Sequence, residues 1–510
     1  MQTDSHVEQT HLSANTSANR IVIFGASGDL TRRKLIPALY HLFNHGMLPD
    51  NFSIIGVGRT ELSNDSFRQH LQQSLPAEPR DQATVSSFCH HVFYLTANPS
   101  EAAQLAPLAA GHAQQDSKYP GGNTLYYLAT PPALYAPIAQ SLFSLGLNRQ
   151  ENNWSRLVVE KPFGHNLASA RQLDRELHAC FNEKQIYRID HYLGKETVQN
   201  LLVLRFANTI FEPLWNCSMV DFIEITAAES LGVEKRGAFY ERTGAVRDML
   251  QNHLLQVLAM VAMEQPATIS ADVLRDQAVQ IMRLFRPLTD EDVRNHLILG
   301  QYLASNVRGE NLVAYREESG VSAESRTETY VALKMYIDSA RWQGVPIYLR
   351  TGKRLPTRAT EVVLHFKKTL HPSFTGVAPA NKLIIRIQPD EGILVSFGLK
   401  RPGSGFQVQD VAMDFHYSDL SGAVMPDAYE RLLLDALNGD STLFARSDEV
   451  ETCWSFIQPI LDYLQDPAHT LYGYAAGTWG PQEADQLLAT DGHAWRFPCK
   501  NLTSTQYCEL

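Results

Sequence analysis

The chain has 510 residues, of which 44% are hydrophobic and 19% charged, so it is long enough for two or three domains with full cores. Its 44 Lys and Arg residues against 55 Asp and Glu residues give a formal net charge of −11, which argues against a nucleic-acid partner. No apolar run approaches the roughly 18 residues of a membrane span, and the six cysteines form no C-x-x-C pair, so we expect neither a zinc site nor a disulfide framework.

The first 20 residues form a polar segment that is rich in Ser, Thr, Asn and Gln. They contain one Lys or Arg residue, Arg20, and no apolar core of the kind that a signal peptide needs. We therefore expect residues 1–20 to be a disordered tail. We expect the protein to be cytoplasmic, with a plastid-like compartment as the alternative if a targeting segment was removed.

A strand, a glycine turn, a helix and a second strand follow the tail. Residues 21–24 are a short apolar run that ends at Gly25, residues 30–46 carry apolar side chains at helical spacing, and residues 53–57 are again apolar. This order predicts a βαβ unit of the dinucleotide-binding type. Further apolar strands, separated by helical stretches, extend it into a parallel, doubly wound sheet, and they are expected over residues 92–95, 123–128 and 155–159.

The sequence pattern changes beyond Lys195. Three segments alternate polar and apolar side chains, which predicts a mainly antiparallel sheet with one solvated face, and they cover residues 219–226, 329–337 and 381–388. Helices are expected over residues 244–264, 427–438 and 448–464, the last interrupted near Pro459. We therefore predict a Rossmann-type α/β domain over residues 21–195, followed by a larger α+β domain over residues 196–510.

The glycine turn carries the pattern G-x-x-G rather than the more common G-x-G-x-x-G. Small residues at Gly25 and Gly28 allow the backbone to approach a pyrophosphate, and the following helix supplies free N–H groups and its positive end. The second strand runs into Arg59 with no acid at its tip, where an enzyme for NAD usually has Asp or Glu. Since a guanidinium group can bind a phosphate through two hydrogen bonds, we expect Arg59 to bind the 2′-phosphate of NADP.

Residues 187–196 read Tyr-Arg-Ile-Asp-His-Tyr-Leu-Gly-Lys-Glu and concentrate acidic, basic and phenolic side chains in one stretch. His191 and Lys195 stand at positions i and i+4, so on a helix they would lie on one face and could bind a phosphate dianion. Asp190 could orient a base that comes from elsewhere in the chain. A polar helix start with a capping Asp and a solvated Lys is the alternative interpretation of these residues alone.

This segment resembles the substrate signature of the glucose-6-phosphate dehydrogenases. Three other segments resemble that family in the same order, namely Gly25-Ala-Ser-Gly-Asp-Leu30, Glu160-Lys-Pro-Phe-Gly164 and Arg247-Asp-Met-Leu-Gln-Asn-His253. A weaker similarity continues to Gly477-Thr-Trp-Gly-Pro481. The resemblance covers nearly the whole chain except its first 20 residues.

The resemblance implies that D-glucose 6-phosphate is oxidised at C1 to 6-phospho-D-glucono-1,5-lactone with hydride transfer to NADP, the first step of the oxidative pentose phosphate pathway. His253 is then the general base and Asp190 its orienting partner. The implied substrate-binding residues are Lys161, His191, Tyr192, Lys195, Glu229, Asp248, Lys353 and Arg358. The implied coenzyme-binding residues are Gly25, Ala26, Ser27, Gly28, Asp29, Leu30, Arg59 and Lys161.

The family resemblance also implies that the second domain, over residues 196–510, binds substrate and mediates oligomerisation. It implies a homodimer or homotetramer, and a cis peptide bond before Pro162. The reaction needs no metal, and the chain contains no H-E-x-x-H motif or Cys/His cluster. We therefore expect no metal, no nucleic acid and no membrane among its partners.

One spacing is unfavourable for this assignment. Asp248 and His253 are five residues apart, which is roughly 140° around a regular α-helix. They share a pocket only if Asp248 lies at the start of the helix or if the sugar wraps around its side. Two alternative functions are a related sugar dehydrogenase that acts on another sugar and a degenerate NADP-binding regulator.

Three cysteines suggest a redox hypothesis. Cys453 lies on the helix predicted over 448–464, and Cys499 and Cys508 lie in a polar C-terminal tail that could fold back. A transient disulfide could then tie the tail to the substrate domain.

Overall fold

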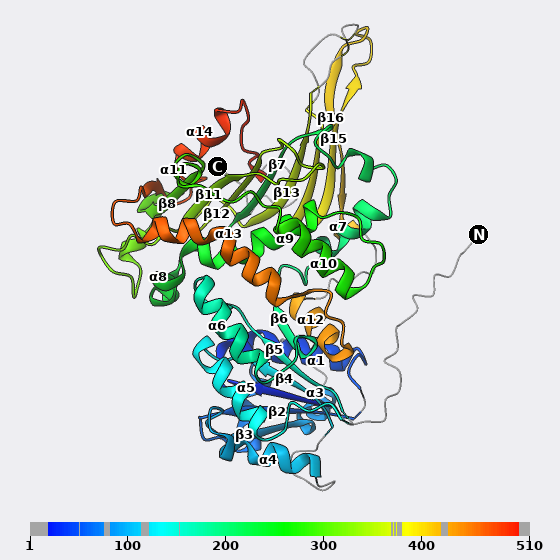
Figure 1. The fold of residues 1–510 in the computed structure, drawn as a ribbon, viewed down its shortest axis with the longest axis vertical. Coiled ribbons are helices and arrows are strands. Elements are labelled where there is room, and N and C mark those ends of the chain that lie inside the picture. The colour runs from blue at the N-terminus through cyan, green and yellow to red at the C-terminus, as the bar shows by residue number, and fades with distance from the viewer. Residues whose placement is uncertain are drawn as a thin grey trace, which may run out of the picture.

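The computed structural model describes residues 19–49, 51–75, 82–113, 122–151, 153–368, 371, 374, 380–419 and 427–498. Residues 1–18 of the predicted tail lie outside the described residues, and the first strand begins at Asn19. The described chain forms two regions, one above the other in Figure 1, and each is built around one large sheet.

The first region contains a seven-stranded sheet in the order β17-β6-β5-β4-β1-β2-β3. Strands β1 to β6 run parallel, and the short β17 runs antiparallel beside β6 at the edge. From β1 the chain extends one half of the sheet through β2 and β3 and the other half through β4, β5 and β6, which is the doubly wound order. The strands are β1 (Asn19–Phe24), β2 (Phe52–Gly58), β3 (Val92–Thr96), β4 (Asn123–Leu128), β5 (Ser155–Val159), β6 (Ile186–Ile189) and β17 (Phe444–Ala445).

Helices cover both faces of this sheet, which confirms the predicted α/β fold. Alternate residues of β1 point to opposite sides, so Ile21 and Ile23 pack in the apolar cluster with α1, whereas Val22 and Phe24 pack in the cluster with α5. A π-helical turn, the first π segment (Thr31–Leu35), leads from the glycine turn into α1. The helices are α1 (Ile36–Asn44), α2 (Asn64–Gln72), α3 (Gln82–His90), α4 (Ala102–Ala113), α5 (Tyr135–Ser144) and α6 (Leu167–His178).

The second region contains a nine-stranded sheet in the order β16-β15-β14-β13-β7-β12-β11-β8-β18. Neighbouring strands are antiparallel except in the pairs β7–β12 and β8–β18, so the prediction of a mainly antiparallel sheet is confirmed. The strands are β7 (Val220–Ala228), β8 (Leu297–Leu303), β11 (Tyr330–Met335), β12 (Ile347–Gly352), β13 (Ala359–Phe366), β14 (Lys382–Gln388), β15 (Gly392–Lys400), β16 (Val408–His416) and β18 (Tyr472–Ala475). A separate hairpin consists of β9 (Ser305–Val307) and β10 (Glu310–Leu312).

Helices α7, α9, α10 and α13 lie between this sheet and the first region (Figure 1). A longer π-helical stretch, the second π segment (Val246–Leu254), connects α8 to α9. The helices are α7 (Glu196–Phe206), α8 (Gly237–Ala245), α9 (Leu255–Ala262), α10 (Ala271–Met282), α11 (Asp290–His296), α12 (Ala428–Asn438), α13 (Ser447–Gln465) and α14 (Glu483–Ala489).

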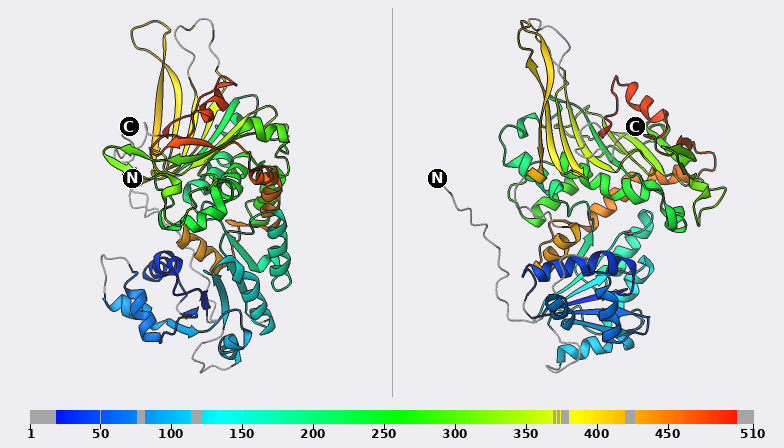
Figure 2. Two further views of the ribbon diagram at one scale, coloured as in Figure 1. Left: turned by 90° about the vertical axis from the view of Figure 1, so that its left-hand side faces the viewer. Right: turned by 180° about the vertical axis from the view of Figure 1, so that it is seen from behind.

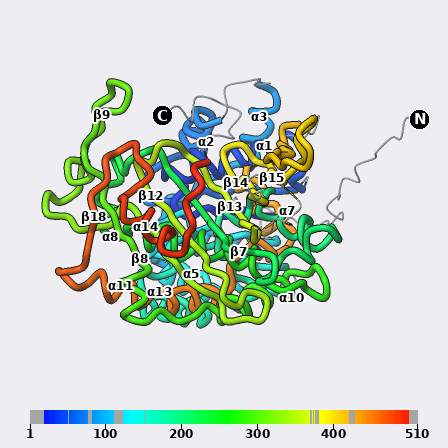
Figure 3. The backbone as a smooth tube through the Cα atoms, turned by 90° about the horizontal axis from the view of Figure 1, so that it is seen from above, coloured from blue at the N-terminus to red at the C-terminus, as the bar shows by residue number. Residues whose placement is uncertain are grey.

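The prediction that one face of this sheet is solvated is wrong for its central strands. On β11, Val331 and Leu333 pack in the same apolar cluster as α9, and Tyr330 packs on the opposite side with Leu487 of α14 and with Trp495. Figure 3 shows α14 and the segment after it crossing the outer face of the sheet. The alternating pattern arose because the outer face carries buried polar residues that pair with one another.

That buried pairing is clearest around Glu224 of β7, whose side chain is fully buried. Its carboxylate lies 3.2 Å from Nε2 of His365 and 3.7 Å from the guanidinium group of Arg350, and it accepts hydrogen bonds of 3.1 Å from the backbone N–H of Arg496. Charged side chains on this face are therefore covered by the C-terminal part of the described chain rather than by water.

A late segment of the chain returns to the first region. β17 extends the first sheet, α12 packs against α1, and α13 packs against α6 (Figure 2). The predicted boundary at residues 195 and 196 stays a prediction, but residues 428–445 belong to the first region by their contacts. The predicted interruption of the last helix near Pro459 is wrong, because α13 continues through this residue. Pro459 has no N–H group to bond the carbonyl group of Ser455, but Ser455 is exposed, so the helix tolerates the missing hydrogen bond.

Cys453 is fully buried on α13, which argues against it as an accessible redox thiol. Cys499 and Cys508 lie outside the described residues, so their part of the redox hypothesis stays a prediction. Across the described ranges, none of the helices combines the length and the apolar character that crossing a membrane requires.

Candidate active site

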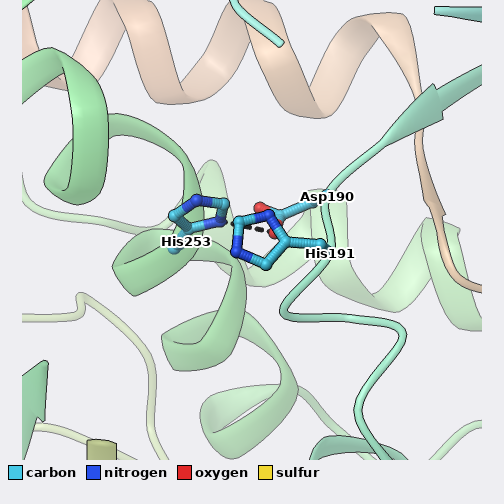
Figure 4. A group of neighbouring side chains, drawn as sticks. All are labelled: Asp190, His191 and His253. Atoms are coloured by element: carbon cyan, nitrogen blue, oxygen red, sulfur yellow. Dashed lines mark hydrogen bonds and ion pairs between the residues drawn. The ribbon is translucent and has the colours of Figure 1, made fainter. Parts of the chain in front are cut away.

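The predicted site residues meet where the first sheet faces the second π segment. Lys161 follows β5 and is joined to Pro162 by a cis peptide bond, Asp190 follows β6, and His253 lies on the second π segment. Figure 4 shows the carboxylate of Asp190 and the two imidazole rings of His191 and His253 gathered at this junction. The carboxyl ends of parallel strands thus contribute two of the site residues, as is general for open α/β sheets.

The prediction that His191 and Lys195 lie on one face of a helix is wrong. Residues 190–194 form turns, closed by a hydrogen bond from the N–H of Leu193 to the carbonyl oxygen of Asp190, and Lys195 is the N-cap of α7. The polar pattern therefore belongs to a strand-to-helix connection. Its compact turns still keep both side chains at the site.

Asp190 and His253 form a buried pair. Nδ1 of His253 lies 2.5 Å from Oδ1 of Asp190, and the two residues are 1% and 3% exposed. Burial alone would raise the pKa of Asp190, but the attraction and hydrogen bond of His253 outweigh burial and lower the pKa to about 2. Burial lowers the pKa of His253, so its ring is neutral near pH 7 and carries its lone pair on Nε2.

Aromatic rings fix the orientation of His253. The ring of Tyr192 stacks on it with centroids 4.3 Å apart, and the ring of His191 meets it edge-on at 4.5 Å. Burial is the main cause that holds the pKa of His191 well below its usual value, and the nearby His253 and Lys161 lower this pKa further. His191 therefore enters the site as a neutral hydrogen-bonding group and not as a cation.

The second π segment resolves the unfavourable spacing of Asp248 and His253. In a π-helix the backbone hydrogen bond joins residues five apart, so positions i and i+5 lie on the same side. Nζ of Lys161 accordingly reaches both residues, at 3.1 Å from Oδ1 of Asp248 and 2.7 Å from Nε2 of His253. Asp248 also lies in the first turn of this segment, shortly after the non-helical Gly244, so the first of the two arrangements considered above, with Asp248 at the start of the helix, is confirmed.

Positive and negative side chains alternate across the site from this point. Asp248 lies between Lys161 and Lys353, with 4.0 Å between Oδ2 of Asp248 and Nζ of Lys353. Lys353, only 3% exposed, also donates a hydrogen bond to Glu229. Burial would raise the pKa of Asp248, but Lys161 and Lys353 lower it below its usual range. Each charged side chain here is thus paired with one of opposite charge, and a polar group of a ligand can take the place of either partner.

Lys195 and Arg358 lie at another corner of the site. Burial lowers the pKa of Lys195, the negative charge of Glu391 opposes this change, and the positive charge of Arg358 lowers the pKa further. Arg358 is exposed and donates a 3.3 Å hydrogen bond to Gln388, whose amide in turn contacts the hydroxyl of Tyr192 at 3.5 Å. Sequence reasoning missed Gln388. Its only signal was its place at the end of a predicted strand.

The glycine turn lies at the carboxyl end of β1. Gly25 has a φ of +81°, and a Cβ atom there would lie 2.2 Å from the carbonyl oxygen of Ala129, which directly follows the neighbouring strand β4. The turn is closed by a 2.9 Å hydrogen bond from the N–H of Gly28 to the carbonyl oxygen of Gly25. Only glycine fits at position 25. The tight turn that begins there leads the chain directly to the start of the first π segment.

Arg59 is exposed and comes directly after β2, the strand beside β1. Ser27 of the turn and Thr60 lie 3.4 Å apart through their hydroxyl oxygens, so the turn and Arg59 share one end of the sheet. Ala26 and Leu30 complete the turn, while Asp29 forms exposed ion pairs with Arg32 and Arg33. Small residues, the start of a helical segment and a nearby guanidinium group are together suited to a dinucleotide with an additional phosphate.

Two family models cover nearly all of the chain. The model described as glucose-6-phosphate dehydrogenase, NAD binding domain, matches residues 22–200, and the model described as glucose-6-phosphate dehydrogenase, C-terminal domain, matches residues 202–496. The chain belongs to the glucose-6-phosphate dehydrogenase family.

Whole-chain comparisons agree with this membership. A glucose-6-phosphate 1-dehydrogenase of Aggregatibacter actinomycetemcomitans is 56% identical, with 94% of this chain and 97% of the relative covered. The enzyme of the same name from Treponema pallidum is 48% identical over 98% of this chain and 99% of its own. A solved glucose-6-phosphate dehydrogenase in complex with glucose-6-phosphate superposes with a TM-score of 0.87 at 34% identity, over 94% of this chain and 98% of that one.

The side chains of Asp190, His191 and His253 lie close enough together to form a metal site on geometry alone. In this dehydrogenase-family chain, however, Nδ1 of His253 is already bonded to Asp190 and its Nε2 to Lys161. The expectation that the reaction uses no metal stays a prediction.

Proposed function

We propose that this chain oxidises D-glucose 6-phosphate at C1 to 6-phospho-D-glucono-1,5-lactone with NADP as the hydride acceptor, the first step of the oxidative pentose phosphate pathway. The observation that carries the proposal is the buried Asp190–His253 pair, whose Nε2 faces Lys161 in a chain of this family. A neutral, oriented imidazole is the group that removal of a hydroxyl proton requires.

His253 acts as the general base. Nε2 takes the proton of the C1 hydroxyl while the hydride leaves C1, and the sugar becomes a lactone with a new C1–O double bond. Asp190 keeps the imidazole in the required tautomer and stabilises the imidazolium that forms. Bound NADP supplies the electrophilic carbon that accepts the hydride.

Lys161 connects the base to the substrate. Without substrate its ammonium group donates to Nε2 of His253, so the C1 hydroxyl must take its place at that nitrogen. The ammonium group then lies beside the C1 oxygen, where a positive charge stabilises the negative charge that develops as the proton leaves.

The other pocket residues bind the sugar and its phosphate. Asp248 and Glu229 accept hydrogen bonds from sugar hydroxyls, with Lys353 between them. The phosphate, which carries a charge of about −1.5 to −2 at pH 7, is bound at the corner formed by Lys195, Arg358, His191 and Tyr192. The ammonium and guanidinium groups supply charge there, and the neutral imidazole and the phenol supply hydrogen bonds.

The coenzyme binds at the glycine turn, with the pyrophosphate against the backbone of residues 25–30 and the 2′-phosphate at Arg59. Support comes from the shared end of the sheet where the turn and Arg59 lie. The coenzyme is therefore NADP rather than NAD.

The protein assembles as a homodimer or homotetramer through the hairpin of β15 and β16, which projects from the second region (Figure 2). Large apolar side chains are exposed on it, namely Leu399 (50%), Phe406 (62%), Met413 (62%) and Phe415 (38%). Exposed apolar groups on an edge strand favour contact with a second copy. Met413→Glu should lower the mass measured by light scattering, whereas the matched change Phe143→Glu on α5, at a side chain that is 50% exposed, should not.

The protein works in the cytoplasm. Cys89, Cys180, Cys217 and Cys453, the cysteines of the described part of the chain, are all unpaired, as is usual in a reducing compartment.

The test is the increase in NADPH absorbance after glucose 6-phosphate is added. Rapid turnover with glucose 6-phosphate and slow turnover with free glucose support the proposal. Faster turnover with another sugar would favour a related sugar dehydrogenase, and NADP binding without turnover would favour a regulator.

A further inference from the structure

Glu160 is a buried carboxylate that the proposed reaction does not use. It follows β5 directly, is 9% exposed, and accepts a hydrogen bond of 2.5 Å at Oε1 from the hydroxyl of Tyr127. The hydroxyl of Tyr429 also lies near enough to this carboxylate to affect its pKa. Because a buried carboxylate is costly without donors, the bond from Tyr127 fixes its position.

The two tyrosines come from distant parts of the chain. Tyr127 lies on β4, where it is paired with Val158 of β5, and Tyr429 lies in the first turn of α12. α12 belongs to the returning segment that packs against α1. Glu160 is therefore bonded to a residue of the sheet and lies near a residue of a helix about 270 residues later in the sequence.

Lys161 is the next residue after Glu160. Glu160 and Lys161 share a peptide bond just beyond the end of β5, so a restraint on Glu160 also limits where the Lys161 side chain can point. The positive charge of Lys161 and the negative charge of this carboxylate also attract each other. The Lys161 side chain points so that its Nζ lies 2.7 Å from Nε2 of His253.

We propose that Glu160 is a positioning residue, which Tyr127 and Tyr429 orient so that the ammonium group of Lys161 stays beside Nε2 of His253. The inference rests on the function proposed above for Lys161 and His253. It assigns Glu160 no contact with substrate or coenzyme.

This positioning has a signature in the pH profile. After burial, the positive charge of Lys161 is among the causes that lower the pKa of His253. If the ammonium group moves away, that pKa rises, and the base is protonated at a higher pH. The acidic limb of kcat/KM for glucose 6-phosphate then moves to higher pH.

Neighbouring residues of β4 provide a matched pair of variants. Tyr127→Phe removes the hydroxyl that bonds Glu160, and Tyr126→Phe removes an equally buried hydroxyl that donates to the carbonyl oxygen of Leu147 on the opposite side of the sheet. We expect Tyr127→Phe to lower kcat/KM about tenfold, as for one hydrogen bond to a charged group, and to move the acidic limb upward. Tyr126→Phe should change neither.

A double-mutant cycle separates positioning from a general structural effect. In a Lys161→Ala background, Tyr127→Phe should cause no further loss of kcat/KM, since the group that it orients is gone. An equal loss in both backgrounds, or an unchanged pH limb in Tyr127→Phe, overturns the inference. If circular dichroism shows that Tyr127→Phe does not fold, Tyr429→Phe takes its place in the cycle with the same expected results.

The wild-type assay in the same series tests the proposed function by itself. A wild type that does not oxidise glucose 6-phosphate contradicts that function. An active wild type whose activity does not depend on Lys161 contradicts the basis of the inference and leaves the overall reaction in place.

Discussion

The coenzyme turn and the substrate pocket are suited to charged groups in different ways. At the turn proposed to bind the coenzyme, the backbone leaves no room for a side chain at Gly25, and the charged side chain proposed for recognition, Arg59, is exposed. In the substrate pocket Asp190, His253 and Lys353 are at most 3% exposed, and each is bonded to another charged or polar group. A substitution of Arg59 should therefore change only the affinity for the coenzyme. A substitution at the substrate site should also leave a buried charge without its partner.

The two regions share one local feature, a π-helical segment beside the proposed binding residues. The first π segment follows the glycine turn, and the second π segment carries Asp248 and His253. π-helical turns are rare and often occur at functional sites. In the pocket the altered helical repeat has a direct purpose, since it places two residues five apart beside the same ammonium group.

The largest effect is expected in the pocket, at the base. His253→Asn should lower kcat by at least about 10²-fold, the lower end for loss of a general base, with little change in substrate affinity. Steady-state kinetics and direct binding of glucose 6-phosphate measure the two quantities. A variant that keeps more than a tenth of wild-type turnover would remove His253 from the chemistry.

Lys195→Ala should act on binding instead. We expect the KM for glucose 6-phosphate to rise by about one to two orders of magnitude, as for a lost hydrogen bond to a charged group, and the KM for NADP to stay constant. Initial rates with each substrate varied in turn give both constants. If both rise together, Lys195 supports the fold rather than the phosphate.

Arg59→Ala should show the contrasting behaviour of the coenzyme turn. NADP binding should weaken by about tenfold to a hundredfold, NAD binding should barely change, and the unfolding midpoint should be that of the wild type. Fluorescence titration with both coenzymes measures this. Equal losses for NADP and NAD would place Arg59 away from the 2′-phosphate.

The smallest effect concerns the pH dependence of stability. The pKa of Asp190 is lowered from 3.8 to about 2 in the folded protein, so its stabilising contribution is present above its unfolded pKa and is lost as the pH falls toward 2. Between about pH 5 and about pH 3 the wild type should therefore lose more free energy of unfolding than Asp190→Asn does. Urea titrations measure it, with exposed Asp338→Asn as the control. Parallel curves for wild type and Asp190→Asn would contradict the assigned shift.

Local patterns predicted the first sheet well, because its strands are short apolar runs separated by amphipathic helices and glycine turns. They predicted less of the second region. The alternation in β7 was interpreted as a solvated face, whereas Glu224 is buried beneath the C-terminal part of the described chain. The return of α12 and β17 to the first region depends on contacts between distant residues, which no local window contains.

The family motifs named the site residues, but their geometry could not be read from the sequence. The segment from Asp190 to Lys195 was expected to be helical and is a turn followed by an N-cap. The second π segment has no distinct sequence signature, since its extra residue per turn is selected by packing. Gln388 joins Arg358 and Tyr192 only because β14 ends beside the turn after β6.

Transfer of deuterium from glucose 6-phosphate labelled at C1 tests the central claim most directly. NMR and mass spectrometry of the products would follow the label. The account predicts that deuterium leaves C1 and appears at the nicotinamide ring of NADPH, with the lactone or its hydrolysis product unlabelled at C1. Unlabelled NADPH together with deuterium retained in the sugar product would contradict it.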